Sequence, residues 1–201
     1  MYELVNLYPN GGKEMLHFFH SLFPLSKPVM VYVLENTRYI KVTKGKFIRS
    51  PLDNTETIYF IVKGLMRGFI RDEGVEITTW INEENNVVGS IRNLGLDVDT
   101  EEYIQALEDT LLIAISRTCL DELYDRYPET NIIGRKTLEM YYREAEERAY
   151  LCRLPSAEKR YKRLAQTRKG LIDRVRLKYL ASYLGMKKET LCRIRKKFKA
   201  L

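Results

Sequence analysis

The sequence predicts an α+β chain that begins with an antiparallel β-domain, continues through one long helix and ends in a helix-turn-helix. Three observations support this order. Short apolar segments separated by turn residues fill residues 37–116, helical periodicity runs over residues 129–152, and the C-terminal segment has helix-turn-helix spacing. The predicted domains are residues 1–128, 129–154 and 155–201.

A short helix is predicted over residues 13–22, where apolar residues recur at helical spacing before Pro24 and Pro28 interrupt the pattern. From residue 37 the pattern is that of strands. They are predicted over residues 39–42, 58–62, 65–70, 75–81, 104–107 and 111–115. The segment 71–74 ends in glycine and predicts a hairpin. Many short, evenly spaced strands are typical of a small antiparallel sandwich or barrel.

The pattern then becomes helical, with a short helix predicted over residues 119–127 and a long one over residues 129–152. The long helix would form a rod of roughly 36 Å. Along it, residues recur at alternating spacings of four and three, as in a coiled coil. These residues are Leu138, Tyr142, Ala145, Ala149 and Cys152. The periodicity leaves open whether this stripe packs on the β-domain or on a twin helix from a second subunit.

The segment 154–156 is the predicted boundary before the C-terminal domain. Pro155 ends the long helix because its ring does not fit inside a helix. Ser156 is suited to cap a new helix over residues 157–167, and Glu158 lies favourably in its first turn.

Charge is distributed unevenly between the two parts of the chain. Residues 156–201 carry 16 Lys and Arg against 3 acids, whereas residues 1–155 carry 18 against 24. A strongly basic C-terminal part favours contact with a polyanion, nucleic acid before an acidic membrane surface.

The segment 177–196 carries the most specific pattern in the chain. A helix-turn-helix needs a small residue where the second helix crosses the first, and Ala181 meets this need. It also needs a residue that accepts the turn conformation, and Gly185 meets that. Five apolar side chains are expected to point inward: Leu180, Leu184, Met186, Leu191 and Ile194.

The remaining positions of the second helix are expected to face a DNA major groove. Arg193 can donate two hydrogen bonds to guanine, and Glu189 can accept one from cytosine. The other bases suit phosphates, which add affinity but little sequence information. The predicted DNA-binding residues are Lys187, Lys188, Glu189, Thr190, Arg193, Arg195, Lys196 and Lys197.

Residues 180–195 resemble the DNA-binding element of the CRP/FNR family of transcriptional regulators. The family pattern R-E-T-x-x-R is matched by Lys188, Glu189, Thr190 and Arg193. The resemblance extends upstream. Residues 59–64 look like a strand of the family's β-roll, Gly45 like an earlier turn glycine, and residues 129–152 like its dimerisation helix.

This resemblance implies a β-roll of the double-stranded β-helix or jelly-roll type, a dimerisation helix and a winged-helix-like DNA-binding domain. It implies a homodimer that grips a roughly palindromic site in double-stranded DNA, with RNA polymerase as a further candidate partner. The family's wing is expected to be reduced or absent, because the sequence ends a few residues after Phe198.

The effector site departs from the family pattern for cyclic nucleotides. Ser90 stands where the family's glutamate holds the ribose, and Thr100 stands near the position of its phosphate-binding arginine. Carboxylates around Thr100 would repel a phosphate, so cyclic AMP is not an expected effector. The candidate effector-pocket residues are Gly89, Ser90, Ile91, Arg92 and Thr100. The four-cysteine pattern of the family's iron–sulfur members is absent as well.

Other classes of function are less well supported by the sequence. A metal-dependent β-barrel enzyme would need a cluster of histidines and carboxylates on the strands. The two histidines, His17 and His20, instead lie in the predicted N-terminal helix. We therefore expect no catalytic residue, resident metal or cofactor, and a cytoplasmic protein without a membrane partner. Two alternatives remain: non-specific nucleic-acid binding by a basic module, and a ligand-binding β-roll in which DNA binding is secondary.

Overall fold

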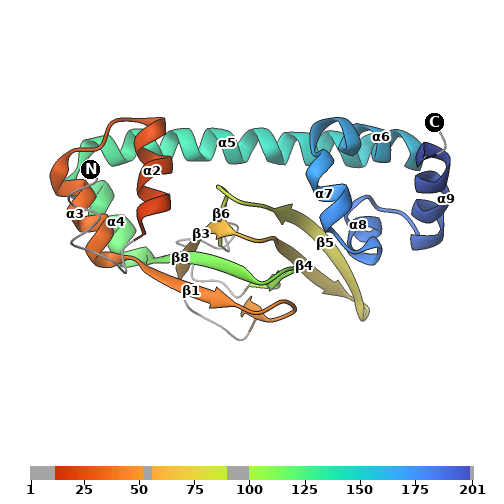
Figure 1. The fold of residues 1–201 in the computed structure, drawn as a ribbon, viewed down its shortest axis with the longest axis horizontal. Helices are drawn as coiled ribbons and strands as arrows, with labels where there is room; N and C mark the ends of the chain where they lie inside the picture. Colours follow the sequence, from red (N-terminus) through yellow and green to blue (C-terminus); the bar gives the residue numbers. More distant parts are fainter. Residues whose placement is uncertain (1–11, 52–55, 90–99, 200–201) are drawn as a thin grey trace. The chain divides into compact units, whose positions relative to one another are not determined.

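The computed structural model describes residues 12–51, 56–89 and 100–199 (Figure 1). Its helices are α2 (Lys13–Leu22), α3 (Lys27–Asn36), α4 (Arg117–Arg126), α5 (Pro128–Arg153), α6 (Ala157–Thr167), α7 (Lys169–Arg174), α8 (Leu177–Tyr183) and α9 (Lys188–Lys199). Its strands are β1 (Arg38–Val42), β2 (Phe47–Arg49), β3 (Thr57–Lys63), β4 (Met66–Asp72), β5 (Val75–Asn82), β6 (Val87–Val88), β7 (Tyr103–Ala106) and β8 (Thr110–Ser116).

The chain divides into two compact units. The first unit comprises Met1–Arg67 and Asn82–Glu139, and the second comprises Gly68–Ile81 and Met140–Leu201. The second unit therefore groups most of the β4–β5 hairpin, which the sequence places in the β-domain, with the C-terminal helices.

The β-domain consists of two four-stranded sheets, as the alternating strand pattern predicts. One has the strand order β1-β8-β3-β6, and the other has the order β2-β7-β4-β5. In the first sheet β8 pairs antiparallel with both β1 and β3. Phe60 lies opposite Ile113, and Ile58 lies opposite Ile115. Because side chains alternate along a strand, these four residues share one face of the sheet.

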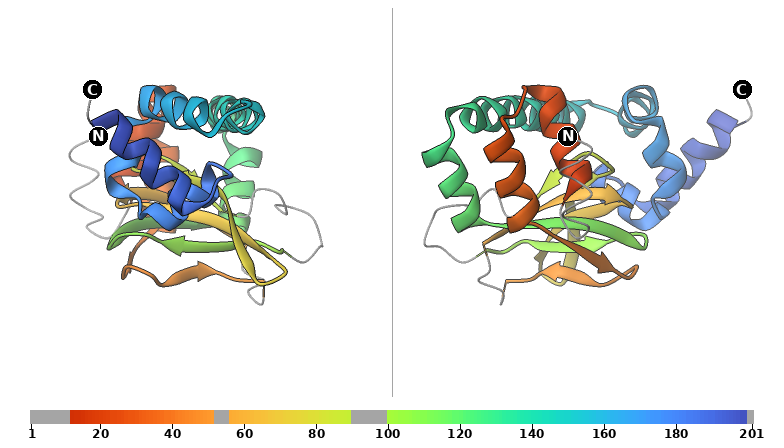
Figure 2. Two further views of the ribbon diagram at one scale, coloured as in Figure 1. Left: turned by 90° about the vertical axis from the view of Figure 1, so that its right-hand side faces the viewer. Right: turned by 60° about the vertical axis from the view of Figure 1, so that its left-hand side comes forward.

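Helices cover this face of the first sheet (Figure 2). Phe60 and Ile113 form one core cluster with buried residues of α2 and α3, among them Leu16 and Val33. The rings of Phe18 and Phe60 lie 5.4 Å apart between their centroids. The helices thus bury the apolar face that β3 and β8 present.

Helix α3 was not predicted, because Pro28 was interpreted as a helix breaker. The structure places Pro28 in the first turn of α3. A proline is tolerated there because the first amide groups of a helix have no partner within the helix. The prediction that Pro28 interrupts a helix was therefore wrong, because the effect of a proline depends on its place in the helix.

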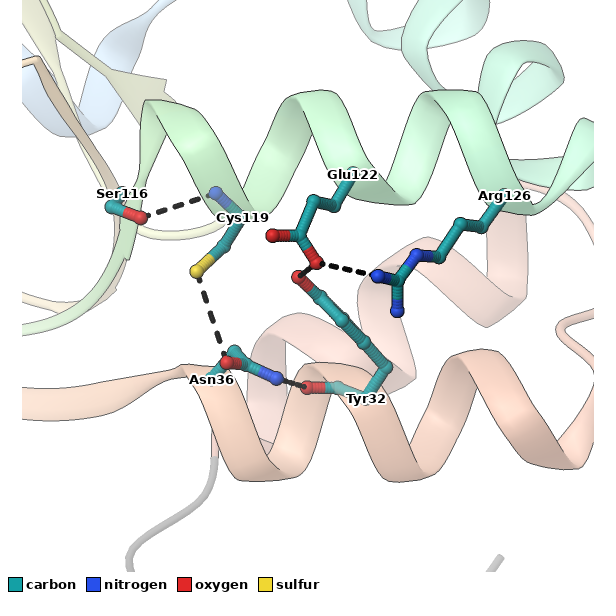
Figure 3. Close-up of polar contacts among 6 residues, drawn as sticks. All are labelled: Tyr32, Asn36, Ser116, Cys119, Glu122 and Arg126. Atoms are coloured by element: carbon teal, nitrogen blue, oxygen red, sulfur yellow. Dashed lines mark hydrogen bonds and ion pairs between the residues drawn. The ribbon is translucent and has the colours of Figure 1, made fainter.

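Polar contacts fix α3 against α4 (Figure 3). The hydroxyl of Tyr32 donates a hydrogen bond of 2.9 Å to Glu122, which also lies 3.5 Å from a guanidinium nitrogen of Arg126. The thiol of Cys119 lies 3.8 Å from the side-chain oxygen of Asn36. Burial and the Glu122 carboxylate raise the pKa of the Tyr32 phenol, so it remains a hydrogen-bond donor.

The other predicted helices are confirmed with small shifts at their ends. Helices α2 and α6 have the predicted bounds, and α5 extends one residue beyond the prediction at each end. Ser156 caps α6 as expected, since its hydroxyl accepts from the amide of Lys159 at 3.2 Å. The short elements β2, β6 and α7 were not predicted. No helix in the described ranges combines the length and apolar character needed to span a membrane.

Candidate nucleic-acid interface

Helices α8 and α9 form the predicted helix-turn-helix in the second unit. Gly185 lies between them with φ of +60°, a conformation that residues with a Cβ adopt at a cost. The amide of Met186 donates to the carbonyl of Ala181 at 3.0 Å, which closes the turn. Ala181 is buried, as expected for a residue at the crossing of two helices.

The helix pair rests on a filled apolar core. Four of the five side chains predicted to point inward are buried: Leu180, Leu184, Leu191 and Ile194. Met186, the fifth, is only half-buried. Helices α6 and α7 supply further buried residues, including Leu164 and Leu171. The ring of Tyr161 packs against Phe198 at the end of α9, with 5.5 Å between the ring centroids.

Burial of Leu191 and Ile194 turns the polar side of α9 outward. Lys187, Lys188, Glu189, Arg193 and Lys196 are exposed, and Thr190 is half-buried. Within residues 12–51, 56–89 and 100–199, the side chains of Lys187, Lys188, Glu189 and Lys196 form no hydrogen bond or ion pair. Arg193 reaches only Thr190, at 3.5 Å. We call four residues of α9, together with Lys187 directly before it, the outer face of α9: Lys187, Lys188, Glu189, Arg193 and Lys196.

Two of the predicted DNA-binding residues contact acids of their own chain instead. Arg195 lies 3.8 Å from the carboxylate of Asp173 and donates to the carbonyl of Ile172 at 3.4 Å. Lys197 donates to both oxygens of Glu158 at 3.0 Å. The predicted DNA-binding residues thus include two groups. Arg195 and Lys197 contact acids of their own chain, whereas the residues on the outward side of α9 do not.

Arginine 160, which the sequence analysis did not single out, joins the linker to the turn. Arg160 donates to the carbonyl of Leu154 at 2.9 Å and to the carbonyl of Gly185 at 3.3 Å. A second arginine of α6, Arg163, forms two hydrogen bonds of 2.7 Å with the carboxylate of Glu147 on α5. This contact lowers the pKa of Glu147. Contacts of α6 with Leu154, with the turn at Gly185 and with α5 thus hold the predicted boundary at residues 154–156 in place.

The β4–β5 hairpin also contacts the helix pair within the second unit. The Ser182 hydroxyl on α8 donates to the carbonyl of Glu76 and accepts from the amide of Thr78, both at 2.9 Å. Arg168 donates to the carbonyl of Ile81 at 2.8 Å. No local sequence signal identifies these contacts, because residues about one hundred positions apart form them.

The stripe predicted on α5 is open in the single chain. Leu138 is 59% exposed and Tyr142 is 64% exposed, although both are large and apolar. Ala149 and Cys152 are exposed as well, and Ala145 is half-buried. Most of the stripe is therefore exposed in the single chain, which leaves a surface available to a second subunit.

Only part of the predicted effector pocket lies in the described residues. Gly89 and Thr100 are buried, whereas Ser90, Ile91 and Arg92 fall outside the described ranges. The Thr100 hydroxyl accepts from the amide of Glu102 at 3.1 Å. His20 accepts from the amide of Leu25 at 3.1 Å and so has a structural role. The described residues contain no group of three or more metal-ligating side chains.

Comparison with known proteins supports the fold. No protein-family model and no curated protein sequence matches the chain. A CRP/FNR-family protein from Eubacterium rectale matches with a TM-score of 0.69 and 18% identity, over 90% of this chain and 88% of its own. A mutant CooA from Carboxydothermus hydrogenoformans matches with a TM-score of 0.66 and 18% identity, over 84% and 78%. The c-di-GMP responsive regulator CLP of Xanthomonas campestris matches with a TM-score of 0.65 and 18% identity, over 87% and 92%. The chain therefore has the fold of the CRP/FNR transcriptional regulators.

Proposed function

We propose that this protein is a homodimeric, sequence-specific DNA-binding transcriptional regulator of the CRP/FNR type. One observation carries the proposal: the outer face of α9 is charged and forms no ion pair within the described chain, while the opposite face is buried in the helix-turn-helix core. An α-helix fits the major groove of B-DNA, and residues near its N-terminus reach the base edges. The fold shared with known regulators supports the same conclusion.

Arg193 and Glu189 are the proposed base-reading residues. They lie four positions apart on α9, so both point to the same side of the helix. Arg193 would donate to O6 and N7 of guanine, and Glu189 would accept from N4 of cytosine. Glu189 is informative because an acid on a basic surface repels the phosphate backbone unless it contacts a base.

The remaining bases are assigned to phosphates. Lys187, Lys188 and Lys196 are exposed around the two base-reading residues. To bind a phosphate, Lys197 would have to release the carboxylate of Glu158, and Arg195 would have to release that of Asp173. Exposed ion pairs contribute only about 0–1 kcal/mol, so a DNA phosphate can compete with these acids.

The proposed dimer forms through α5. Large apolar side chains exposed on one helix stripe are typical of an interaction surface, and alternating spacings of four and three suit a second copy of the same helix. A two-fold dimer would place its two α9 helices in successive major grooves, about 34 Å apart. Its DNA site would therefore be a roughly palindromic repeat, and RNA polymerase would be a further partner at the promoter.

Dimerisation can be tested separately from DNA binding. Tyr142→Glu places a charge at the centre of the stripe and is expected to give a monomer by sedimentation velocity at micromolar concentration. Glu146→Gln, on the same helix and also exposed, is the control and should leave the dimer intact. A wild-type protein that sediments as a monomer at every concentration would overturn the dimer proposal.

DNA recognition is tested by selection from a randomised duplex library, followed by affinity measurement. We expect an inverted repeat, with Arg193→Ala costing about 1–3 kcal/mol and relaxing preference at one base pair of each half-site. Lys41→Ala removes the same charge from the exposed surface of β1 and is expected to leave affinity within twofold. Equal losses for both variants, with no motif recovered, would support non-specific binding by a basic module instead.

A further inference from the structure

The first unit contains an apolar cavity of about 250 Å³ that the proposed function does not use. It lies on the helix-covered face of the first sheet, where Ile58, Phe60 and Ile115 form part of its wall. Helices α2, α3, α4 and the start of α5 supply most of the rest of the wall, and β6 adds Val87. This face is opposite to that of Ala114 and Leu112 in the same sheet, because side chains alternate along β8.

The size of the cavity sets the size of a ligand. An engineered cavity of about 150 Å³ lined by apolar side chains binds benzene, and larger ligand pockets exceed about 300 Å³. A cavity of 250 Å³ therefore suits a compact molecule of roughly ten non-hydrogen atoms. Its lining is almost entirely apolar, so the greater part of the ligand must be apolar too.

One polar group in the wall has no partner in the described chain. Tyr124, on α4, is half-buried, and its hydroxyl forms no hydrogen bond to any residue in the described ranges. Burial raises the pKa of its phenol, so the hydroxyl stays protonated at neutral pH and can donate. Two other wall hydroxyls are occupied: Thr130 donates to the carbonyl of Leu123 at 2.7 Å, and Thr137 donates to that of Ile133 at 2.9 Å.

Gly134 makes room for this tyrosine. A Cβ at Gly134 would lie 2.8 Å from the Tyr124 hydroxyl oxygen and 2.9 Å from a ring carbon. A glycine inside a helix costs about 0.5–1 kcal/mol relative to alanine, and here it allows the phenol to lie against α5 at the cavity wall.

The cavity carries no net charge that would favour an anion. Among the described residues, the only charged one in its wall is Arg117, whose Nε donates to both carboxylate oxygens of Asp121, at 2.7 and 2.8 Å. A phosphate or carboxylate ligand would have to compete with Asp121 for this guanidinium. A neutral ligand has no such competitor.

We propose that this cavity binds a small neutral aromatic or aliphatic molecule with one hydroxyl or carbonyl group, which pairs with Tyr124. Leu138 belongs both to the cavity wall and to the exposed stripe of α5. A ligand that orders Leu138 therefore acts on the helix through which the dimer is proposed to form. The role of this molecule as an effector rests on the proposed function, whereas its binding does not.

Binding is tested with three matched probes and the full-length protein, by calorimetry in the absence of DNA. The probes are 2-naphthol, naphthalene and 2-naphthoate. We expect saturable binding of 2-naphthol, and at least tenfold weaker binding of the anionic 2-naphthoate. Tyr124→Phe should weaken 2-naphthol about two- to tenfold and leave naphthalene unchanged, because only one hydrogen bond is lost.

A cavity-filling variant supplies the second arm. The double variant Val29→Phe and Val33→Phe adds two rings to the wall from one face of α3 and should weaken both 2-naphthol and naphthalene at least tenfold. Circular dichroism and the thermal midpoint verify that it folds. No saturable binding of 2-naphthol to the wild type overturns the proposal, as does binding that neither Tyr124→Phe nor the double variant changes.

The effector role is read from DNA affinity with and without 2-naphthol. The effector role is supported if 2-naphthol changes the DNA affinity and Tyr124→Phe makes that change smaller. If saturating 2-naphthol leaves the DNA affinity unchanged, the effector role is overturned, but the proposed binding site is not. If the protein binds no DNA duplex under any condition, the regulator proposal fails. The calorimetry still decides whether the cavity binds 2-naphthol, because it is done without DNA.

Discussion

The helix-turn-helix and the β-domain use buried apolar residues in opposite ways. Around Leu191 the apolar side chains fill the interior, and the useful result is a charged outer face on α9. Around Tyr124 they leave a space of about 250 Å³ between helices and strands. A filled core supports binding groups on the surface of the protein, whereas an incompletely filled core can bind a ligand in its cavity. The comparison is tested by filling or emptying each interior.

The largest expected effect is loss of packing under α9. Leu191→Ala empties a filled core and should lower the free energy of unfolding by about 2–5 kcal/mol, measured by urea denaturation. DNA affinity should fall with it, because α9 loses its support. Lys188→Ala, three residues earlier on the outer face, is the control and should leave stability nearly unchanged. Equal stability of the two variants would show that this core is not filled.

A matched pair of valine substitutions compares the two interiors directly. Val33 borders the cavity and Val175 lies in the filled core of the second unit, and both are buried. Val175→Phe should cost about 1–3 kcal/mol because a well-packed core has no room for the ring. Val33→Phe should cost less than about 1 kcal/mol, since the ring can enter existing space. Equal costs in urea denaturation would contradict the comparison.

The turn of the helix-turn-helix provides a third test, at the scale of backbone strain. Gly185→Ala should cost about 1 kcal/mol, because alanine tolerates φ of +60° poorly while no neighbouring atom lies within 4 Å of the new Cβ. Gly170→Ala, inside α7, is the control and is expected to retain or gain stability. If both alanines behave alike in thermal unfolding, the left-handed conformation at Gly185 is not required.

The smallest expected effect concerns the ion pair between α5 and α6. Arg163 lowers the pKa of Glu147, so this contact stabilises the fold at neutral pH, and the contribution is lost as the pH falls through the lowered pKa. The difference in unfolding free energy between wild type and Glu147→Gln should therefore shrink between pH 7 and about pH 3. Glu146, whose side chain forms no ion pair in the described part of the chain, supplies the control variant Glu146→Gln. A difference that stays constant with pH would contradict this interpretation.

The sequence predicts most of the second unit because its signals are local. Ala181 and Gly185 lie four residues apart, and Ser156 directly precedes the helix that it caps. The outer face of α9 follows from the same short segment. The DNA-contacting roles of these residues, and of Arg195 and Lys197 in particular, stay predictions.

What the sequence did not predict depends on contacts between distant residues or on packing density. Ser182 meets Glu76 and Thr78 across about one hundred positions, and no periodicity encodes such a contact. The cavity depends on how completely apolar side chains from seven elements fill the space between them. The sequence identifies the apolar residues, but it does not show how much of the space between them their side chains fill. The candidate pocket at Gly89 and Thr100 rested on the family resemblance and remains untested.

The hydroxyl of Ser182 has a further consequence for solubility. Strand β5 is the last in its sheet order, and an edge strand with open amide and carbonyl groups invites pairing with another chain. Ser182 occupies one carbonyl and one amide of this edge, so α8 acts as a cover for it. Any rearrangement that lifts α8 away from β5 would uncover a template for intermolecular β-pairing. The motion of this helix pair is therefore limited by the need to cover the edge of β5 as well as by its proposed role in binding DNA.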